Sequence, residues 1–119
     1  MSKPPKLYGI FLGTNGNLLL TRMTSESREN DIRFFTRSQK TETFFPKKKF
    51  DGCEIAVVAN AYPFKAPGYK NNIASHICGE DVYGNVIILK VNEDGMRCLM
   101  KLQRARNIME AIRDEYLFD

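Results

Sequence analysis

The sequence predicts one α+β domain, an antiparallel or mixed sheet of about five to seven strands with a C-terminal helix packed on one face. Two patterns lead to this prediction. Short apolar, β-branched segments alternate with turn residues over most of the chain, and an amphipathic helical pattern occupies its end. The 119 residues suit a single domain over 1–119, because no repeat or linker divides them.

The N-terminal part of the chain predicts a hairpin followed by a third strand. Residues 7–12 alternate between two faces, and 17–23 form the partner strand, because the intervening Asn-Gly pair is typical of a hairpin turn. Residues 24–30 are polar throughout and predict an exposed loop. Residues 32–36 are rich in aromatic side chains, so we expect a third strand there.

The middle of the chain predicts a buried strand between two irregular segments. Residues 38–43 are polar, and in 44–50 the proline Pro46 has no N–H for a sheet ladder, so that segment is an edge strand or a loop. Residues 53–59 are apolar and β-branched and predict a buried central strand. A long connection over 60–72 follows.

The next segment predicts a short helix and a hairpin. Asn72 is placed to cap a helical turn over 73–78. Residues 82–91 predict the strongest strand of the chain. The polar turn 92–95 then predicts a return strand over 96–100.

The C-terminal helix shows one apolar stripe at three- and four-residue spacing. Packing of this stripe on the sheet is the default expectation, and docking on a partner helix is the alternative. The residues of the stripe are Leu102, Ala105, Met109, Ile112 and Tyr116.

The net charge of +4 is unevenly distributed along the chain. Residues 1–70 hold 12 Lys/Arg and 6 Asp/Glu, a net of +6, whereas 71–119 hold 6 and 8, a net of −2. A basic half suggests an anionic partner, such as nucleic acid, a phosphorylated ligand or an acidic protein. The plainer interpretation is that such a charge is ordinary for a protein that binds no nucleic acid.

A basic aromatic segment carries the clearest binding chemistry. Proteins that bind single strands combine lysines, which neutralise phosphates, with aromatic rings on which bases stack. Alternatively, the rings belong to the core and the lysines to a solvated turn. The candidate contact residues are Phe44, Phe45, Lys47, Lys48, Lys49 and Phe50, with Arg33, Arg37 and Lys40 nearby in the sequence.

The histidine and cysteines predict neither a metal site nor a cofactor. His76 is the only histidine, and Cys53, Cys78 and Cys98 lack the paired spacings of zinc ligands. A Cys–His nucleophile pair needs proximity in the fold, and nothing local supports one, so we lean against an enzyme. An odd cysteine count without a C-x-x-C spacing favours reduced thiols.

No apolar segment has the length of a signal core or a membrane span. We therefore expect an intracellular protein, cytoplasmic or nuclear, that is not secreted and has no membrane partner.

Residues 53–95 also carry a recognisable pattern. A strand ending in Asn is followed by a loop, an N-x-x-A-S segment, and two glycines ahead of a strand and an acidic Gly turn. This pattern resembles a family of short uncharacterised proteins, a domain of unknown function found in phages, bacteria and large DNA viruses. The resemblance implies a viral or phage origin, and with it an accessory or virion-associated role in a host cell or virion. The matching positions are Asn60, Asn72, Ala74, Ser75, Gly79, Gly84, Val86, Ile87 and Gly95.

These observations lead us to expect a non-enzymatic interaction module that docks a basic aromatic surface onto nucleic acid or an acidic protein. One alternative is a virion-associated or other structural protein that self-assembles through a sheet edge or its last helix. Another is an enzyme without a recognisable motif.

Overall fold

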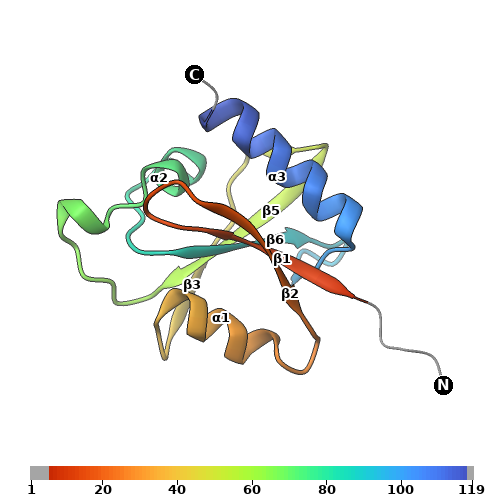
Figure 1. Ribbon diagram of the computed structural model, residues 1–119, viewed down its shortest axis with the longest axis horizontal. Helices are drawn as coiled ribbons and strands as arrows, with labels where there is room; N and C mark the ends of the chain where they lie inside the picture. The colour runs from red at the N-terminus through yellow and green to blue at the C-terminus, as the bar shows by residue number, and fades with distance from the viewer. Residues whose placement is uncertain (1–5, 118–119) are drawn as a thin grey trace.

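An antiparallel sheet is the central layer of the structure, a computed structural model that describes residues 6–117 (Figure 1). Its strands are β1 (Leu7–Leu12), β2 (Leu18–Met23), β3 (Thr41–Phe44), β4 (Lys49–Phe50), β5 (Cys53–Asn60), β6 (Val86–Val91) and β7 (Arg97–Cys98). They follow the order β2-β1-β6-β5-β3, with β4 paired to β5 and β7 paired to β6. Every one of these pairs is antiparallel.

Helices cover both faces of the sheet. The helix α1 (Arg28–Thr36) packs over β5 and β6 on one face, and α3 (Leu102–Tyr116) packs over β1 and β2 on the other (Figure 1). The short helix α2 (Asn72–Cys78) shares a core with α3, and the 3-10 turn η1 (Pro67–Tyr69) lies between β5 and α2. The predicted α+β arrangement, with the C-terminal helix on one face of the sheet, is confirmed.

The alternation of side chains along the strands divides the core in two. In β6, Val86 and Ile88 contribute to the larger core beneath α2 and α3, whereas Ile87 and Leu89 contribute to the smaller core beneath α1. All four side chains are fully buried, which explains why this strand is apolar on both faces.

The apolar stripe of α3 is part of the larger core. Ala105 and Ile112 are fully buried, and so is Ile108, which the predicted stripe left out. Met109 and Tyr116 pack half-buried at the edges of this core. The sheet therefore occupies the face that would otherwise be offered to a partner helix.

The third strand predicted over 32–36 is wrong, because these residues form the second half of α1. The helix is started by a reciprocal pair of hydrogen bonds: Ser27 Oγ accepts from Thr24 N at 3.1 Å, and Thr24 Oγ1 accepts from Ser27 N at 3.0 Å. This arrangement resembles a capping box. Ile32 and Thr36, four residues apart, are then buried on the sheet. The loop predicted over 24–30 is wrong for residues 28–30, which form the first turn of α1.

The other differences concern the ends of elements. The strand expected over 82–91 begins only at Val86, and the polar segment 38–43 contains most of β3, an edge strand. The predicted cap Asn72 is the first residue of α2, and its neighbour Asn71 is the cap. Element ends depend on contacts with distant segments, which local patterns do not contain.

Asn71 ties three parts of the fold together. Its side chain is buried, its Oδ1 accepts from the backbone N–H of Ala74 at 3.1 Å, and its Nδ2 donates to the carbonyls of Leu12 at 3.1 Å and Gly84 at 3.0 Å. The end of β1, the start of α2 and the turn before β6 are thereby held at one end of the sheet.

Within residues 6–117, none of the helices combines the length and the apolar content needed to cross a bilayer.

Candidate binding surface at one end of the sheet

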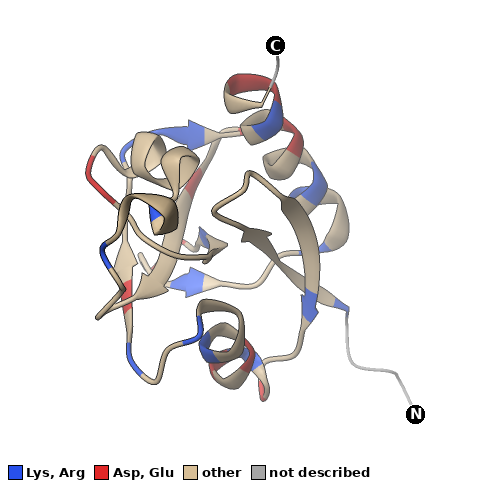
Figure 2. Cartoon of the chain, turned by 60° about the vertical axis from the view of Figure 1, so that its left-hand side comes forward, with Lys and Arg blue, Asp and Glu red and all other residues tan. Residues whose placement is uncertain are grey.

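The predicted contact residues fall at opposite ends of β5. The backbone of Lys49 pairs with Glu54 near the start of this strand, whereas Thr41, just after Lys40, pairs with Asn60 at its end. The seven steps from Cys53 to Asn60 span roughly 23 Å at about 3.3 Å per residue. The structure therefore separates the lysine run from Arg37 and Lys40, which lie near Asn60, and Figure 2 shows Lys and Arg on several separate elements.

The basic aromatic segment does not form one stacking surface. Phe50 is only 2% exposed and belongs to the larger core, and Phe44 packs half-buried against the same core. Lys48 forms an ion pair with Glu115 of α3 and lies 5.7 Å from the centre of the Phe50 ring. Of the three rings, Phe45 alone is exposed, so two of the predicted stacking groups are unavailable.

Exposed aromatic rings gather instead at the other end of β5. Phe34 of α1 is 76% exposed, and the connection after β5 carries the exposed rings of Tyr62, Phe64 and Tyr69. The rings of Phe64 and Tyr69 meet edge to face with their centroids 5.1 Å apart. Large apolar groups clustered in water mark interaction sites more often than isolated ones do.

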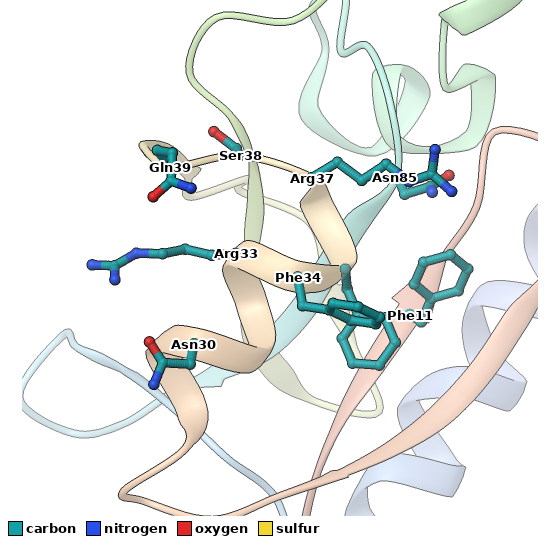
Figure 3. Close-up of a pocket in the computed structure, with 9 residues that line it drawn as sticks. Phe11, Asn30, Arg33, Phe34, Arg37, Ser38, Gln39 and Asn85 are labelled. Atoms are coloured by element: carbon teal, nitrogen blue, oxygen red, sulfur yellow. The ribbon is translucent and has the colours of Figure 1, made fainter.

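An open groove of about 710 Å³ runs along the exposed side of α1, and we call it the helix groove. Figure 3 shows the Arg37 side chain extending from the end of α1 toward Asn85, on the same side as Phe34 and Phe11. Arg33 extends from the opposite side of the helix. Of the two predicted arginines, Arg37 is thus the one beside the rings. The residues lining the groove are Phe11, Asn30, Arg33, Phe34, Phe35, Arg37, Ser38, Gln39 and Asn85.

A second cavity of about 330 Å³, which we call the aromatic pocket, adjoins the helix groove because Arg37 and Asn85 line both. Pro63, Phe64 and Tyr69 supply its apolar walls. The remaining lining residues are Thr14, Thr36, Asn60 and Gly84. The pocket is assembled from the β1–β2 turn, the end of α1, the connection after β5 and the segment before β6.

Hydrogen bonds fix the walls of the aromatic pocket. The carbonyl of Tyr69 accepts from Gly84 N at 2.6 Å, which anchors the connection beside the start of β6. Asn60 Oδ1 accepts from Ser38 Oγ and from Tyr62 N, both at 2.8 Å, and so joins the end of β5 to the turn after α1. Asn85 Oδ1 accepts from Thr14 N at 3.2 Å. The polar side chains are therefore held in place before any ligand arrives.

Arg37 has an unusual backbone conformation for an arginine. It follows the last residue of α1 with φ 53° and ψ 45°, in the left-handed region where glycine is the usual residue. Its N–H donates to Phe34 O at 3.3 Å, and Ser38 N donates to Arg33 O at 3.0 Å, which closes the helix. The strain costs about 1–2 kcal/mol relative to a right-handed residue. Strain of this kind is often retained where a side chain has a role in binding.

Arg37 forms no ion pair with a carboxylate of the described residues. Ion pairs in the described part of the chain engage Arg28, Lys48, Lys70, Arg97 and Arg104, and Arg37 is in none of them. An exposed guanidinium with free N–H groups beside aromatic rings is suited to a phosphate or to the acceptor atoms of a base.

The Cys78–His76 pair lacks the chemistry of a nucleophile. Burial, with a smaller contribution from the charge of Glu80, raises the pKa of the Cys78 thiol to about 12. The thiol is therefore protonated at neutral pH, and a protonated thiol is a weak nucleophile. The exposed ring of His76 stacks on Tyr116 with centroids 6.4 Å apart. Among residues 6–117, no cluster of three His, Cys, Asp or Glu side chains could hold a metal ion.

Comparison of the chain with protein-family models found no match, and comparisons with curated proteins and with solved structures found none either. The resemblance of residues 53–95 to a family of viral, phage and bacterial proteins therefore stays a prediction.

Most of the aromatic residues of this surface were missed in the sequence. Phe34 was predicted to lie in a strand, so its position on the exposed side of a helix was not predicted. The signal for the others lies in the connection over 60–72, where Tyr62, Phe64 and Tyr69 occur among prolines and a glycine. Connecting segments run over the surface, so three aromatics in one of them predict exposed rings.

Proposed function

We propose that the chain is a non-enzymatic interaction module that binds single-stranded nucleic acid through the helix groove and the aromatic pocket. The observation that carries this proposal is the placement of Arg37, free of any ion pair among the described residues, beside the exposed rings of Phe34, Phe64 and Tyr69.

Exposed rings favour a single strand over the other anionic partners. Stacking of a base on an aromatic side chain contributes about 1–3 kcal/mol, and it requires a base whose face is free. A duplex keeps its base faces stacked inside, and an acidic protein surface would be matched by clustered cations. Here the cations are spread over separate elements (Figure 2), whereas Arg37 lines the same two cavities as the exposed rings of Phe34, Phe64 and Tyr69.

Fluorescence anisotropy with a labelled single-stranded oligonucleotide tests this proposal. We expect binding that weakens as salt rises from about 50 to 200 mM, because bound phosphates release counterions. Phe64→Ala should weaken binding by about 5-fold or more, through the loss of one stacking contact. Arg37→Gln should weaken binding and flatten its salt dependence.

Matched controls come from the opposite end of β5. Phe45→Ala removes another exposed ring, and Lys47→Gln removes one exposed positive charge. Both should bind like the parent protein. Three outcomes would each overturn the proposal. The first is an equal loss of affinity for Phe64→Ala and Phe45→Ala, and the second is no binding to the oligonucleotide at low salt. The third is displacement of the strand by an acidic peptide at a lower concentration than unlabelled oligonucleotide requires.

A further inference from the structure

Three polar side chains of the aromatic pocket, Asn60, Asn85 and Arg37, carry hydrogen-bond donors that have no partner among the described residues. Asn85 Oδ1 accepts from the backbone N–H of Thr14, and Asn60 Oδ1 accepts from two groups. Because a backbone N–H can only donate, these bonds fix which end of each amide is the oxygen. In the described chain neither Nδ2 group makes a hydrogen bond. Arg37 adds a guanidinium that can only donate.

A pocket with these three donors discriminates between bases. Guanine presents two adjacent acceptors, N7 and O6, on one edge, whereas adenine pairs an acceptor with an N6 amino donor. Cytosine likewise presents an amino donor on its exposed edge, and thymine presents one acceptor beside a methyl group. Donors that face the amino group of adenine or cytosine would be left unpaired, which lowers affinity.

The size and walls of the pocket suit one base. Its volume of about 330 Å³ lies at the lower end of the range for small-molecule sites. Phe64 and Tyr69 offer a ring face and a ring edge at right angles, since their planes meet at 82°. A planar base can stack on one ring while the other ring closes the side of the pocket.

We propose that the aromatic pocket holds one unstacked guanine of the bound strand. Its N7 and O6 accept hydrogen bonds from Arg37 and Asn85, and its ring packs against Phe64 or Tyr69. This proposal rests on the proposed binding of single strands and adds the base that the pocket selects.

Oligonucleotides that differ in one central base test the proposal. In a host strand of cytosines, a central guanine should bind about 10-fold more tightly than a central adenine, as expected for a pair of good hydrogen bonds to a base edge. Asn85→Asp keeps the acceptor for Thr14 N–H but replaces the NH₂ group with an oxygen. This variant should lose the guanine preference and favour adenine or cytosine, because its carboxylate accepts from their amino groups.

Asn30→Asp is the matched control, because it makes the same change of charge at a residue that lines the groove outside the aromatic pocket. It should weaken binding of every strand equally and keep the guanine preference. The readout is a ratio of two affinities from one protein sample, so partial inactivation of a variant leaves it unchanged. Free guanosine monophosphate should displace the strand only far above the concentration of oligonucleotide that does so, because it lacks the flanking contacts.

The outcomes separate the two proposals. Equal affinity for all central bases, or a guanine preference that survives Asn85→Asp, overturns the guanine pocket and leaves single-strand binding intact. Tighter binding of free guanosine monophosphate than of any strand overturns the assignment of the pocket to a base within a strand. Absence of any binding to oligonucleotides overturns the proposed function itself.

Discussion

Arg37 has opposite consequences for folding and for binding. Its left-handed backbone strains an arginine but would not strain a glycine. We expect Arg37→Gly to be more stable than Arg37→Ala by about 1 kcal/mol, because both lose the side chain and only glycine relieves the strain.

Both variants should bind single strands more weakly than the parent. Urea unfolding gives the stability difference and anisotropy gives the affinity. If Arg37→Gly retained the parent's affinity, Arg37 would have no part in binding, and if it were the less stable of the two, the backbone assignment would be wrong.

Asn71 shows how one side chain positions several elements. Its replacement by alanine leaves the Ala74 N–H and the carbonyls of Leu12 and Gly84 without their partner. We expect Asn71→Ala to lower the free energy of unfolding by on the order of 3 kcal/mol, because buried backbone groups are costly to leave unpaired. The exposed neighbour provides the control, since Asn72→Ala should change stability by less than about 0.5 kcal/mol. Urea unfolding of both variants measures the two free energies of unfolding. Similar losses of stability for the two variants would show that the buried amide of Asn71 has no special role.

The elements that could be predicted are those whose sequence pattern lies within the element itself or in its adjoining turn. The hairpin after β1 follows from its Asn-Gly turn, and α3 follows from a stripe in which Ala105 and Ile112 are fully buried. The strands β5 and β6 follow from apolar runs that are buried on both faces.

The helix α1 was missed because its aromatic residues favour strands. Phe34 and Phe35 raise the strand propensity of the segment, whereas the start of the helix depends on hydrogen bonds between Thr24 and Ser27. Tertiary packing decides the outcome, since Ile32 is fully buried on the sheet. An exposed Phe34 is then a consequence of the helical period, and it is one of the rings of the proposed binding surface.

The candidate surface as a whole could be predicted only in part. The sequence pointed to aromatic and basic residues, and Arg37 was among them. It grouped Arg37 with Lys47, Lys48 and Lys49, which the fold places at the opposite end of β5. The aromatic pocket brings together residues as distant in sequence as Thr14 and Asn85. A local sequence pattern cannot predict that these residues lie close together in the fold.

The most direct test of the proposed surface is NMR of the ¹⁵N-labelled protein during titration with a single-stranded oligonucleotide. We expect the largest amide shifts at Arg37, Phe64, Tyr69 and Asn85, around the aromatic pocket and the adjoining groove. The amides of the lysine run 47–49 should change little. Shifts centred on the lysine run, with the pocket residues unmoved, would contradict binding through the aromatic pocket.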